Sequence, residues 1–298
     1  MRKPLFTGVC TALVTPFLDG KINYPMMEQL LRRQMDSGIH AVVIAGTTGE
    51  SATLSDDEKI HLFRRCKEYV DDRCMIIAGT GSNNTAHSIE LSIAAQEAGA
   101  DALLVVSPYY NKATPDGILL HYLSVCNAVH IPVIVYNVPG RTGLDIPVSV
   151  YEAISKIPNI AGVKEASTDI TKIARIRNAC GQDFPVWSGN DDQIVPVMAL
   201  GGQGVISVLS NILPKETAAL CKAALDGDFD TAADLQCRYL PLIEALFSEV
   251  NPIPVKTAMK EIGYDCGCCR LPLCNISKEN FIKLKKAIKS KPPAKPEA

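Results

Sequence analysis

One pattern repeats along most of the chain: a short apolar run, a polar turn and an amphipathic segment. Short apolar runs bounded by Gly, Pro, Asn or Asp predict buried strands. The segments between them carry apolar residues three and four positions apart, which predicts helices with one buried face. The pattern predicts eight strands, at residues 9–14, 41–45, 75–78, 102–106, 132–136, 160–164, 186–188 and 204–208.

A helix is predicted after each strand. Pro25 suits the first turn of one helix and Gly38 its end, and Ser55 with Glu58 three residues later forms a capping-box signal for the next. The eight predicted helices cover residues 25–37, 56–70, 85–98, 115–129, 147–156, 170–180, 193–200 and 214–225.

This alternation implies parallel strands joined by right-handed crossovers, and eight such units close a (β/α)8 TIM barrel. An open doubly wound sheet is the alternative, but the first turn lacks the Gly-x-Gly-x-x-Gly dinucleotide motif. Beyond residue 226 the pattern predicts helices only, at 229–249, 255–262 and 277–289. We therefore expect a barrel catalytic domain over 1–226, a C-terminal helical region over 227–289 and a disordered tail over 290–298.

Composition narrows the classes of protein. A net charge of −2 and a pI near 6.2 give no reason to expect a nucleic-acid partner. No run of 18 apolar residues predicts a membrane span. Thr7, Gly8 and Thr11 interrupt any signal-like apolar segment near the N-terminus. We expect a cytoplasmic protein with a large core.

Eleven cysteines are many for a chain of 298 residues. Seven lie in apolar or helical patterns, which predicts small buried side chains in a reducing compartment; these are Cys10, Cys66, Cys74, Cys126, Cys180, Cys221 and Cys237. The other four lack the paired Cys-x2-Cys spacing of common zinc sites, so reduced loop thiols are favoured over a metal site; these are Cys266, Cys268, Cys269 and Cys274.

The candidate chemistry centres on Lys164, which ends the apolar run that starts at Ile160. A lysine at the carboxyl end of a buried strand faces the mouth of a barrel, where function lies. Desolvation should lower its pKa, and a partly neutral lysine forms Schiff bases with carbonyl compounds. The alternative is a strand-end lysine that only solvates the rim.

Polar groups at neighbouring strand ends can assist such a lysine. Tyr136 ends the preceding strand, about 4.8 Å away, and can relay protons together with the hydroxyl of Thr47. The turn from Gly46 to Gly49 offers backbone N–H groups to a carboxylate, and Arg141, in a tight loop, could clamp a second one. Tyr136 as a core-edge residue and Arg141 in a surface salt bridge are the plainer alternatives. The set indicates class I aldolase-type chemistry on a keto acid, without a metal or other cofactor.

Five motifs occur in a characteristic order: Gly46-Thr47-Thr48-Gly49-Glu50-Ser51, Pro108-Tyr109-Tyr110-Asn111, Tyr136-Asn137-Val138-Pro139-Gly140-Arg141-Thr142-Gly143, Gly162-Val163-Lys164-Glu165-Ala166 and Asn251-Pro252-Ile253-Pro254-Val255-Lys256. With them the chain resembles the dihydrodipicolinate synthase family, within the pyruvate-dependent aldolases that include N-acetylneuraminate lyase. The likeness covers roughly residues 5 to 288. It implies condensation of pyruvate with L-aspartate 4-semialdehyde to 4-hydroxy-tetrahydrodipicolinate, for diaminopimelate and lysine synthesis.

The resemblance also implies a role for each matching residue. Lys164 forms the imine with pyruvate, and Tyr136, Thr47 and Tyr110 relay protons, with Tyr110 reaching into a neighbouring subunit's site. The backbone of Thr47 and Thr48 binds the pyruvate carboxylate, and Arg141 binds that of the semialdehyde. Gly189 and Ile206 line the pocket through their backbone. Family members are commonly homotetramers, built as dimers of tight dimers.

The chain departs from lysine-inhibited relatives at the implied effector site. That site would comprise Ser51, Ala52, Asp56, Lys59, Asn83, His87 and Tyr109. Sensitive bacterial members typically carry His at position 59 and Glu at position 87, where the carboxylate holds the ammonium group of the effector. A cationic Lys59 and a missing carboxylate at His87 disfavour a cationic ligand. We therefore expect weak or absent inhibition by lysine.

Two other readings remain open on sequence alone. One is a sister lysine aldolase, such as a keto-acid lyase or a hydroxyoxoglutarate aldolase; the residues around Arg141 disfavour it. The other is a catalytically silent member that serves as a binding protein, which the intact set of Lys164, Tyr136, Thr47, Tyr110 and Arg141 disfavours.

Overall fold

The computed structural model describes residues 3–290 and confirms the barrel. Eight parallel strands close on themselves in the order β1-β10-β9-β8-β7-β6-β5-β4. Their bounds are β1 Gly8–Ala12, β4 Ala41–Ile44, β5 Met75–Gly79, β6 Ala102–Val106, β7 Val133–Asn137, β8 Ile160–Glu165, β9 Val186–Ser188 and β10 Gly204–Ser207.

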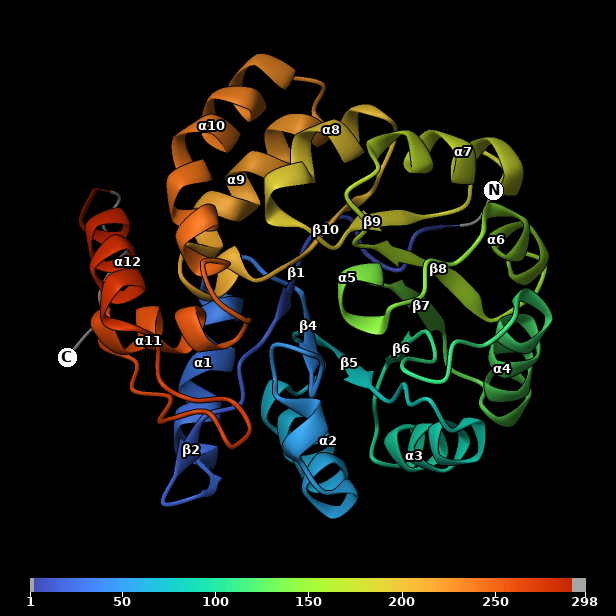
Figure 1. Cartoon of the computed structure of the whole chain (residues 1–298), viewed down its shortest axis with the longest axis horizontal. Helices are drawn as coiled ribbons and strands as arrows, with labels where there is room; N and C mark the ends of the chain where they lie inside the picture. Colours follow the sequence, from blue (N-terminus) through green and yellow to red (C-terminus); the bar gives the residue numbers. More distant parts are fainter. Residues whose placement is uncertain (1–2, 291–298) are drawn as a thin grey trace.

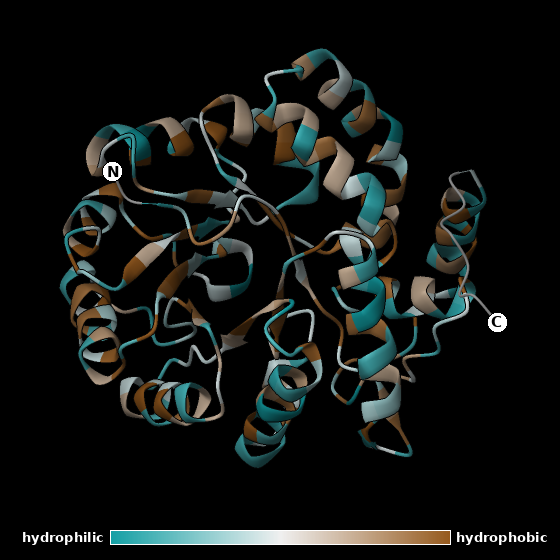
Figure 2. Cartoon of the chain, turned by 180° about the vertical axis from the view of Figure 1, so that it is seen from behind, coloured by the Kyte–Doolittle hydropathy of each residue, from teal (hydrophilic) through white to brown (hydrophobic). Residues whose placement is uncertain are grey.

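Helices surround the barrel, and each follows one of its strands along the chain (Figure 1). They are α1 Tyr24–Asp36, α2 Asp56–Val70, α3 Thr85–Glu97, α4 Pro115–Ala128, α6 Val148–Ile154, α7 Ile170–Cys180, α8 Ile194–Ala199 and α9 Pro214–Leu225. The capping box at the start of α2 is confirmed, because Ser55 accepts from the Glu58 backbone and Glu58 from that of Ser55. Hydrophobic positions are interspersed with polar ones along these helices, as expected of amphipathic segments (Figure 2).

The core has two main layers, because side chains on a strand alternate between its faces. Inside the barrel, Trp187, Tyr136 and Ile206 pack with Leu104 and smaller residues. Between strands and helices lies a larger cluster that includes Phe63, Tyr122 and Tyr151. The catalytic candidates on β7 and β8 thus stand on strands that are packed on both sides.

Short elements in the loops were not predicted. They are the hairpin of β2 Phe17–Leu18 with β3 Lys21–Ile22, the 3-10 turns η1 Ser51–Thr53, η2 Asp191–Gln193 and η3 Leu209–Asn211, and the helix α5 Pro139–Thr142. The tight loop expected around Arg141 was wrong: this residue lies in α5. Elements of two to four residues are too short for a periodic signal to reveal them.

Three further helices follow the barrel: α10 Phe229–Leu246, α11 Ile253–Glu261 and α12 Lys278–Ser290. α10 packs against α9 of the barrel and against α12, and α11 packs against α12 (Figure 1). Ser290, which we expected in a disordered tail, is the last residue of α12. The rest of that tail, 291–298, lies outside the described residues.

The cysteines fit their predicted environments only in part. Cys10, Cys66, Cys74, Cys126 and Cys221 are buried, but Cys237 is exposed on α10 and Cys180 is half-buried at the end of α7. All eleven are free thiols within the described residues. In residues 3–290, no group of three or more His, Cys, Asp or Glu side chains could hold a metal ion. No helix of that part of the chain is long and apolar enough to cross a membrane.

Candidate active site

Lys164 and Tyr136 occupy paired positions at the carboxyl ends of adjacent strands. Tyr136 on β7 is the register partner of Lys164 on β8, and the lysine nitrogen lies 4.3 Å from the centre of the tyrosine ring. Lys164 is 5% exposed and Tyr136 6%. Lys164 has no ion pair among the described residues. A buried lysine of this kind has few groups that compete for its nitrogen, which suits a nucleophile.

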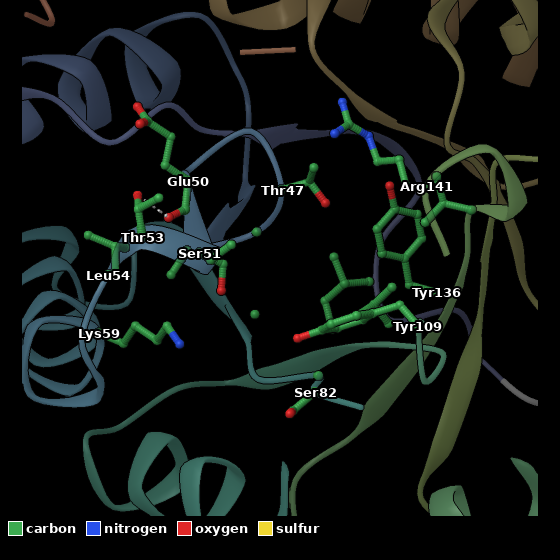
Figure 3. A pocket seen from close by; sticks show the side chains of 18 of the residues that line it. Thr47, Glu50, Ser51, Thr53, Leu54, Lys59, Ser82, Tyr109, Tyr136 and Arg141 are labelled. Carbon is green, nitrogen blue, oxygen red and sulfur yellow. Dashed lines mark hydrogen bonds between the residues drawn. The ribbon is translucent and has the colours of Figure 1, made fainter. Parts of the chain in front are cut away.

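A cavity of about 660 Å³ opens beside this pair. Tyr136 lines it together with Thr47 from the turn after β4 and Arg141 from α5. Figure 3 shows Thr47, Tyr136 and Arg141 on one side of this cavity, while Lys59 points into it from α2 on the other. Lys164 is not among the residues that line the cavity, but its nitrogen lies over the ring of Tyr136, which does line it. The size is that of a small-molecule site.

The turn after β4 is held in a constrained shape. Ala45 and Glu50, at its two ends, have φ of 52° and 58°, the left-handed region that non-glycine residues rarely adopt. The Thr48 hydroxyl accepts a hydrogen bond from Nδ2 of Asn251 at 2.9 Å. This arrangement fixes the position of the Thr47 and Thr48 backbone.

Asn251 links this turn to Arg141. The guanidinium Nη2 of Arg141 donates to the backbone oxygen of Asn251 at 3.0 Å, while its side chain remains exposed. The Oδ1 atom of Asn251 is buried and has no hydrogen-bond partner in the part of the chain that the structure describes. Sequence reasoning used Asn251 only as part of a motif and missed this position, because it lies more than 100 residues from Arg141 along the chain.

Gly189 directly follows β9 and Ile206 lies in β10, and neither is among the residues that line the cavity. The Gly189 N–H donates to the backbone oxygen of Glu165 at 2.7 Å. A Cβ atom at Gly189 would lie 2.6 Å from the Cβ of Ala166, so only glycine fits there. Ile206 is fully buried in the inner core layer beside Tyr136.

Tyr110 is not brought to the other catalytic candidates within one chain. Its side chain is 88% exposed and its φ is 71°. Tyr109, in contrast, lines the cavity although it is 38% exposed. The exposed side chain of Tyr110 is accessible to a second chain.

Most of the expected effector residues lie around the far side of the same cavity. Lys59 and His87 both contact Asp56: Nζ of Lys59 lies 3.4 Å from Oδ1, and Nε2 of His87 lies 2.7 Å from Oδ2. Burial alone would raise the pKa of the Asp56 carboxyl, but the His87 hydrogen bond and the Lys59 charge hold this pKa below its ordinary value. Ser51, Ala52 and Tyr109 also line the cavity; Asn83 does not.

A buried ion pair behind the β4 turn escaped the sequence analysis. Lys256 on α11 donates to Oε1 of Glu50 at 2.8 Å, and both side chains are almost fully buried. The backbone N–H of Arg270 donates to Oε2 of the same carboxylate at 2.8 Å. The C-terminal region therefore contacts the turn at Glu50 and at Thr48. The two residues of the pair lie 206 positions apart, and no local pattern marks such a contact.

A (β/α)8 barrel with a buried lysine at the end of one strand and a tyrosine beside it on the next has the architecture of class I aldolases. A family model, the dihydrodipicolinate synthetase family, matches residues 5–291. The chain belongs to this family.

Individual relatives agree with that assignment. A 4-hydroxy-tetrahydrodipicolinate synthase from Caldicellulosiruptor saccharolyticus is 48% identical over 96% of this chain and 97% of its own. A solved dihydrodipicolinate synthase from Acinetobacter baumannii, in complex with pyruvate, superposes with a TM-score of 0.93 at 39% identity, over 96% of this chain and 98% of its own. A solved dihydrodipicolinate synthase from Cyanidioschyzon merolae, with lysine bound, superposes with a TM-score of 0.93 at 40% identity, over 97% of this chain and 99% of its own.

Proposed function

We propose that this protein is a lyase that condenses pyruvate with L-aspartate 4-semialdehyde to 4-hydroxy-tetrahydrodipicolinate, in diaminopimelate and lysine synthesis. The observation that carries the proposal is the buried Lys164 nitrogen 4.3 Å from the Tyr136 ring, at the carboxyl ends of paired strands. The name of the Caldicellulosiruptor relative and the pyruvate complex of the Acinetobacter relative support this choice of substrates.

The chemistry begins at the lysine nitrogen. The side-chain nitrogen of Lys164 attacks the keto carbon of pyruvate, and the carbinolamine loses water to give an imine. Loss of a proton from the pyruvate methyl group gives an enamine, whose carbon attacks the aldehyde of the second substrate. The amine of that substrate then attacks the imine carbon and displaces Lys164, which closes the ring and frees the enzyme.

Each candidate residue has a role in this sequence. Tyr136, Thr47 and a partner's copy of Tyr110 carry protons between the amine, the carbinolamine and solvent. The backbone at Thr47 and Thr48 binds the pyruvate carboxylate, and Arg141 binds that of the semialdehyde. Gly189 and Ile206 would contact the substrates through their backbone.

The test is turnover of pyruvate with aspartate semialdehyde, coupled to a reductase that consumes NADPH, for wild type and Lys164→Ala. We expect turnover in wild type and none in the variant. Borohydride reduction with pyruvate should add mass at Lys164. An adduct without turnover would indicate a sister keto-acid aldolase, and no adduct would indicate a silent binding member.

We further propose that the protein works in the cytoplasm as a homotetramer, without a cofactor, nucleic acid or membrane as partner. The exposure of Tyr110 leaves its side chain accessible to a second chain in such an assembly. The barrel at 1–226 would carry the catalytic site, and the helices at 227–289 would support it. Sedimentation analysis of the purified protein tests the assembly.

Lysine, in our proposal, inhibits this enzyme weakly or not at all. The Cyanidioschyzon relative has been solved with lysine bound. In this chain, Lys59 and His87 each contact one oxygen of the Asp56 carboxylate, so this carboxylate is not free to bind an incoming ammonium group. Lysine titration against initial rate tests the proposal, and half-inhibition at low millimolar lysine or below would contradict it.

A further inference from the structure

Behind Lys164 and Tyr136 lies a buried polar network that the proposed reaction does not use. Side chains alternate between the faces of a strand, so Glu165 and Asn137 point away from the barrel interior. These two residues directly follow Lys164 and Tyr136 and are also register partners. Each strand therefore carries a reacting side chain on one face and a network residue on the other.

Glu165 is the centre of this network. It is 2% exposed and accepts three hydrogen bonds, each of 2.8 Å: from Nδ2 of Asn137, the backbone N–H of Ser167 and the hydroxyl of Tyr151 on α6. Lys172 on α7 lies 3.8 Å from the same carboxylate. Burial and the Glu165 charge raise the pKa of the Tyr151 hydroxyl, so it stays protonated and donates.

A second carboxylate closes the network. Asp145 accepts a hydrogen bond from Nδ2 of Asn137 at 2.8 Å and contacts the ammonium of Lys172. Asn137 also accepts from the Ile146 backbone at 3.1 Å. The network thus ties β7 and β8 to α6, α7 and the loop between β7 and α6.

The pairing of β7 with β8 is irregular at one point. The register shifts between Val133 and Ile134, where Ala161 has no partner, so β8 contains a bulge near its start. A one-residue slip would reverse the faces of Lys164 and Glu165. The bond from Asn137 to Glu165 lies beyond the bulge, where Lys164 and Tyr136 face each other.

We propose that Glu165, with Asn137, Tyr151 and Lys172, positions Lys164 against Tyr136 and thereby sets the rate of imine formation. This inference rests on the proposed function. The carboxylate does not touch the substrates; it fixes the backbone and register from which the lysine nitrogen projects. Misplacement of a reacting group by about 1 Å can lower a rate by about 100-fold.

Three substitutions test the proposal: Glu165→Gln, Glu165→Ala and Tyr151→Phe. We expect kcat to fall about 100-fold in Glu165→Ala, about tenfold in Glu165→Gln, which keeps the side-chain shape, and less in Tyr151→Phe. The single-turnover rate of borohydride-trapped imine should fall in the same order. KM for pyruvate should stay nearly constant, because the turn at Thr47 and Thr48 that would bind its carboxylate lies outside the network.

The control is Asp101→Asn at the opposite end of the barrel. Asp101 accepts from the Ile76 backbone at 2.7 Å and from Lys67 at 2.8 Å, so this change also neutralises a hydrogen-bonded carboxylate. We expect a lower Tm with unchanged kcat. All rates are measured well below the Tm of each variant.

The outcomes separate the two proposals. If wild type forms no pyruvate adduct, the proposed function fails. If wild type forms it and Glu165→Gln and Tyr151→Phe trap it at the wild-type rate, the network is only structural and the inference is overturned. If Glu165→Ala does not fold, the other two variants still decide.

Discussion

The two sides of the cavity differ in how far their side chains are buried and held by contacts within the same chain. At the β7–β8 side, Lys164 and Tyr136 are buried, paired in register and supported by a hydrogen-bonded network. At the opposite side, Lys59 points into the cavity from α2; the loop after β6 carries Tyr109, which lines the cavity, and Tyr110, which does not line it and lies almost wholly in solvent. The first side is set by packing within the fold, whereas Tyr110 has no cover from its own chain.

This difference bears on what each side can do. Imine formation requires that the reacting nitrogen be held within a fraction of an ångström. Two buried strands that are hydrogen-bonded to each other and to the surrounding helices can hold it so. Binding of a regulator or a second subunit requires accessible groups. A change on the buried side should therefore affect rate or stability strongly, and a change on the open side should affect rate only where a partner subunit or an effector contacts the changed group.

Lys164→Arg should have the largest effect on the buried side. Arginine keeps the positive charge, but its guanidinium stays protonated and cannot form an imine. We expect turnover to fall by at least about 10⁴-fold, with loss of the borohydride adduct. Circular dichroism and Tm should remain close to wild type. Residual turnover within tenfold of wild type would show that the nucleophile lies elsewhere.

Lys256→Met tests the ion pair that supports the turn between the two sides. The substitution leaves Glu50 buried without its cation, which should destabilise the fold by about 3–5 kcal/mol. Urea unfolding measures the change. The double variant Glu50→Gln with Lys256→Met should recover part of the loss, because no unpaired charge remains. A loss of under about 1 kcal/mol in the single variant would show that the pair is dispensable.

Tyr110→Phe tests whether a second chain completes the site, because Tyr110 is exposed within its own chain. If a partner chain brings its hydroxyl to the site, kcat should fall about 100-fold, the usual contribution of a proton-transfer group. Tyr109→Phe serves as the neighbouring control. An unchanged kcat in Tyr110→Phe would remove this residue from the proton relay.

The double variant Lys59→His, His87→Glu tests the open side alone. It removes the cation near Asp56 and adds a carboxylate, so an ammonium ligand gains a partner. We expect lysine to inhibit the variant at a concentration about tenfold lower than in wild type, a typical coupling between sites. The uninhibited kcat should not change. Equal lysine curves for the two proteins would show that these residues do not govern the response.

A smaller effect is expected from acid at the first turn of α2, which also carries Asp56 and Lys59 of the expected effector site. Hydrogen bonds from the Arg270 guanidinium lower the pKa of Glu58, and the Ser55 backbone adds to this. Its ion pair therefore contributes stability above the unfolded pKa of about 4.3, and this is lost as pH falls through the lower folded value. Tm should fall less steeply below pH 4 in Arg270→Gln than in wild type. Parallel curves would contradict the assignment.

Much of the fold follows from the sequence. α2, α7 and α9 and the strands β6 and β9 have the predicted bounds, because each combines a clear apolar period with a cap, a proline or a turn. The short α5 and the hairpin after β1 escaped prediction, since two to four residues give no periodic signal. Cys237 was misplaced: it lies between Gln236 and Arg238 and is exposed on α10, whereas the surrounding helical pattern predicts burial.

The sequence by itself determined the barrel and the positions of Lys164, Tyr136, Thr47 and Arg141 at strand ends and their loops, because strand and helix periods are local properties. Tertiary structure alone decided which distant groups meet: Asn251 with Thr48, Lys256 with Glu50, and the network at Glu165. Such contacts depend on how strands pair and helices pack. Burial then determines how much each polar contact contributes to stability, because a donor or acceptor left without a partner costs most free energy where water cannot reach it.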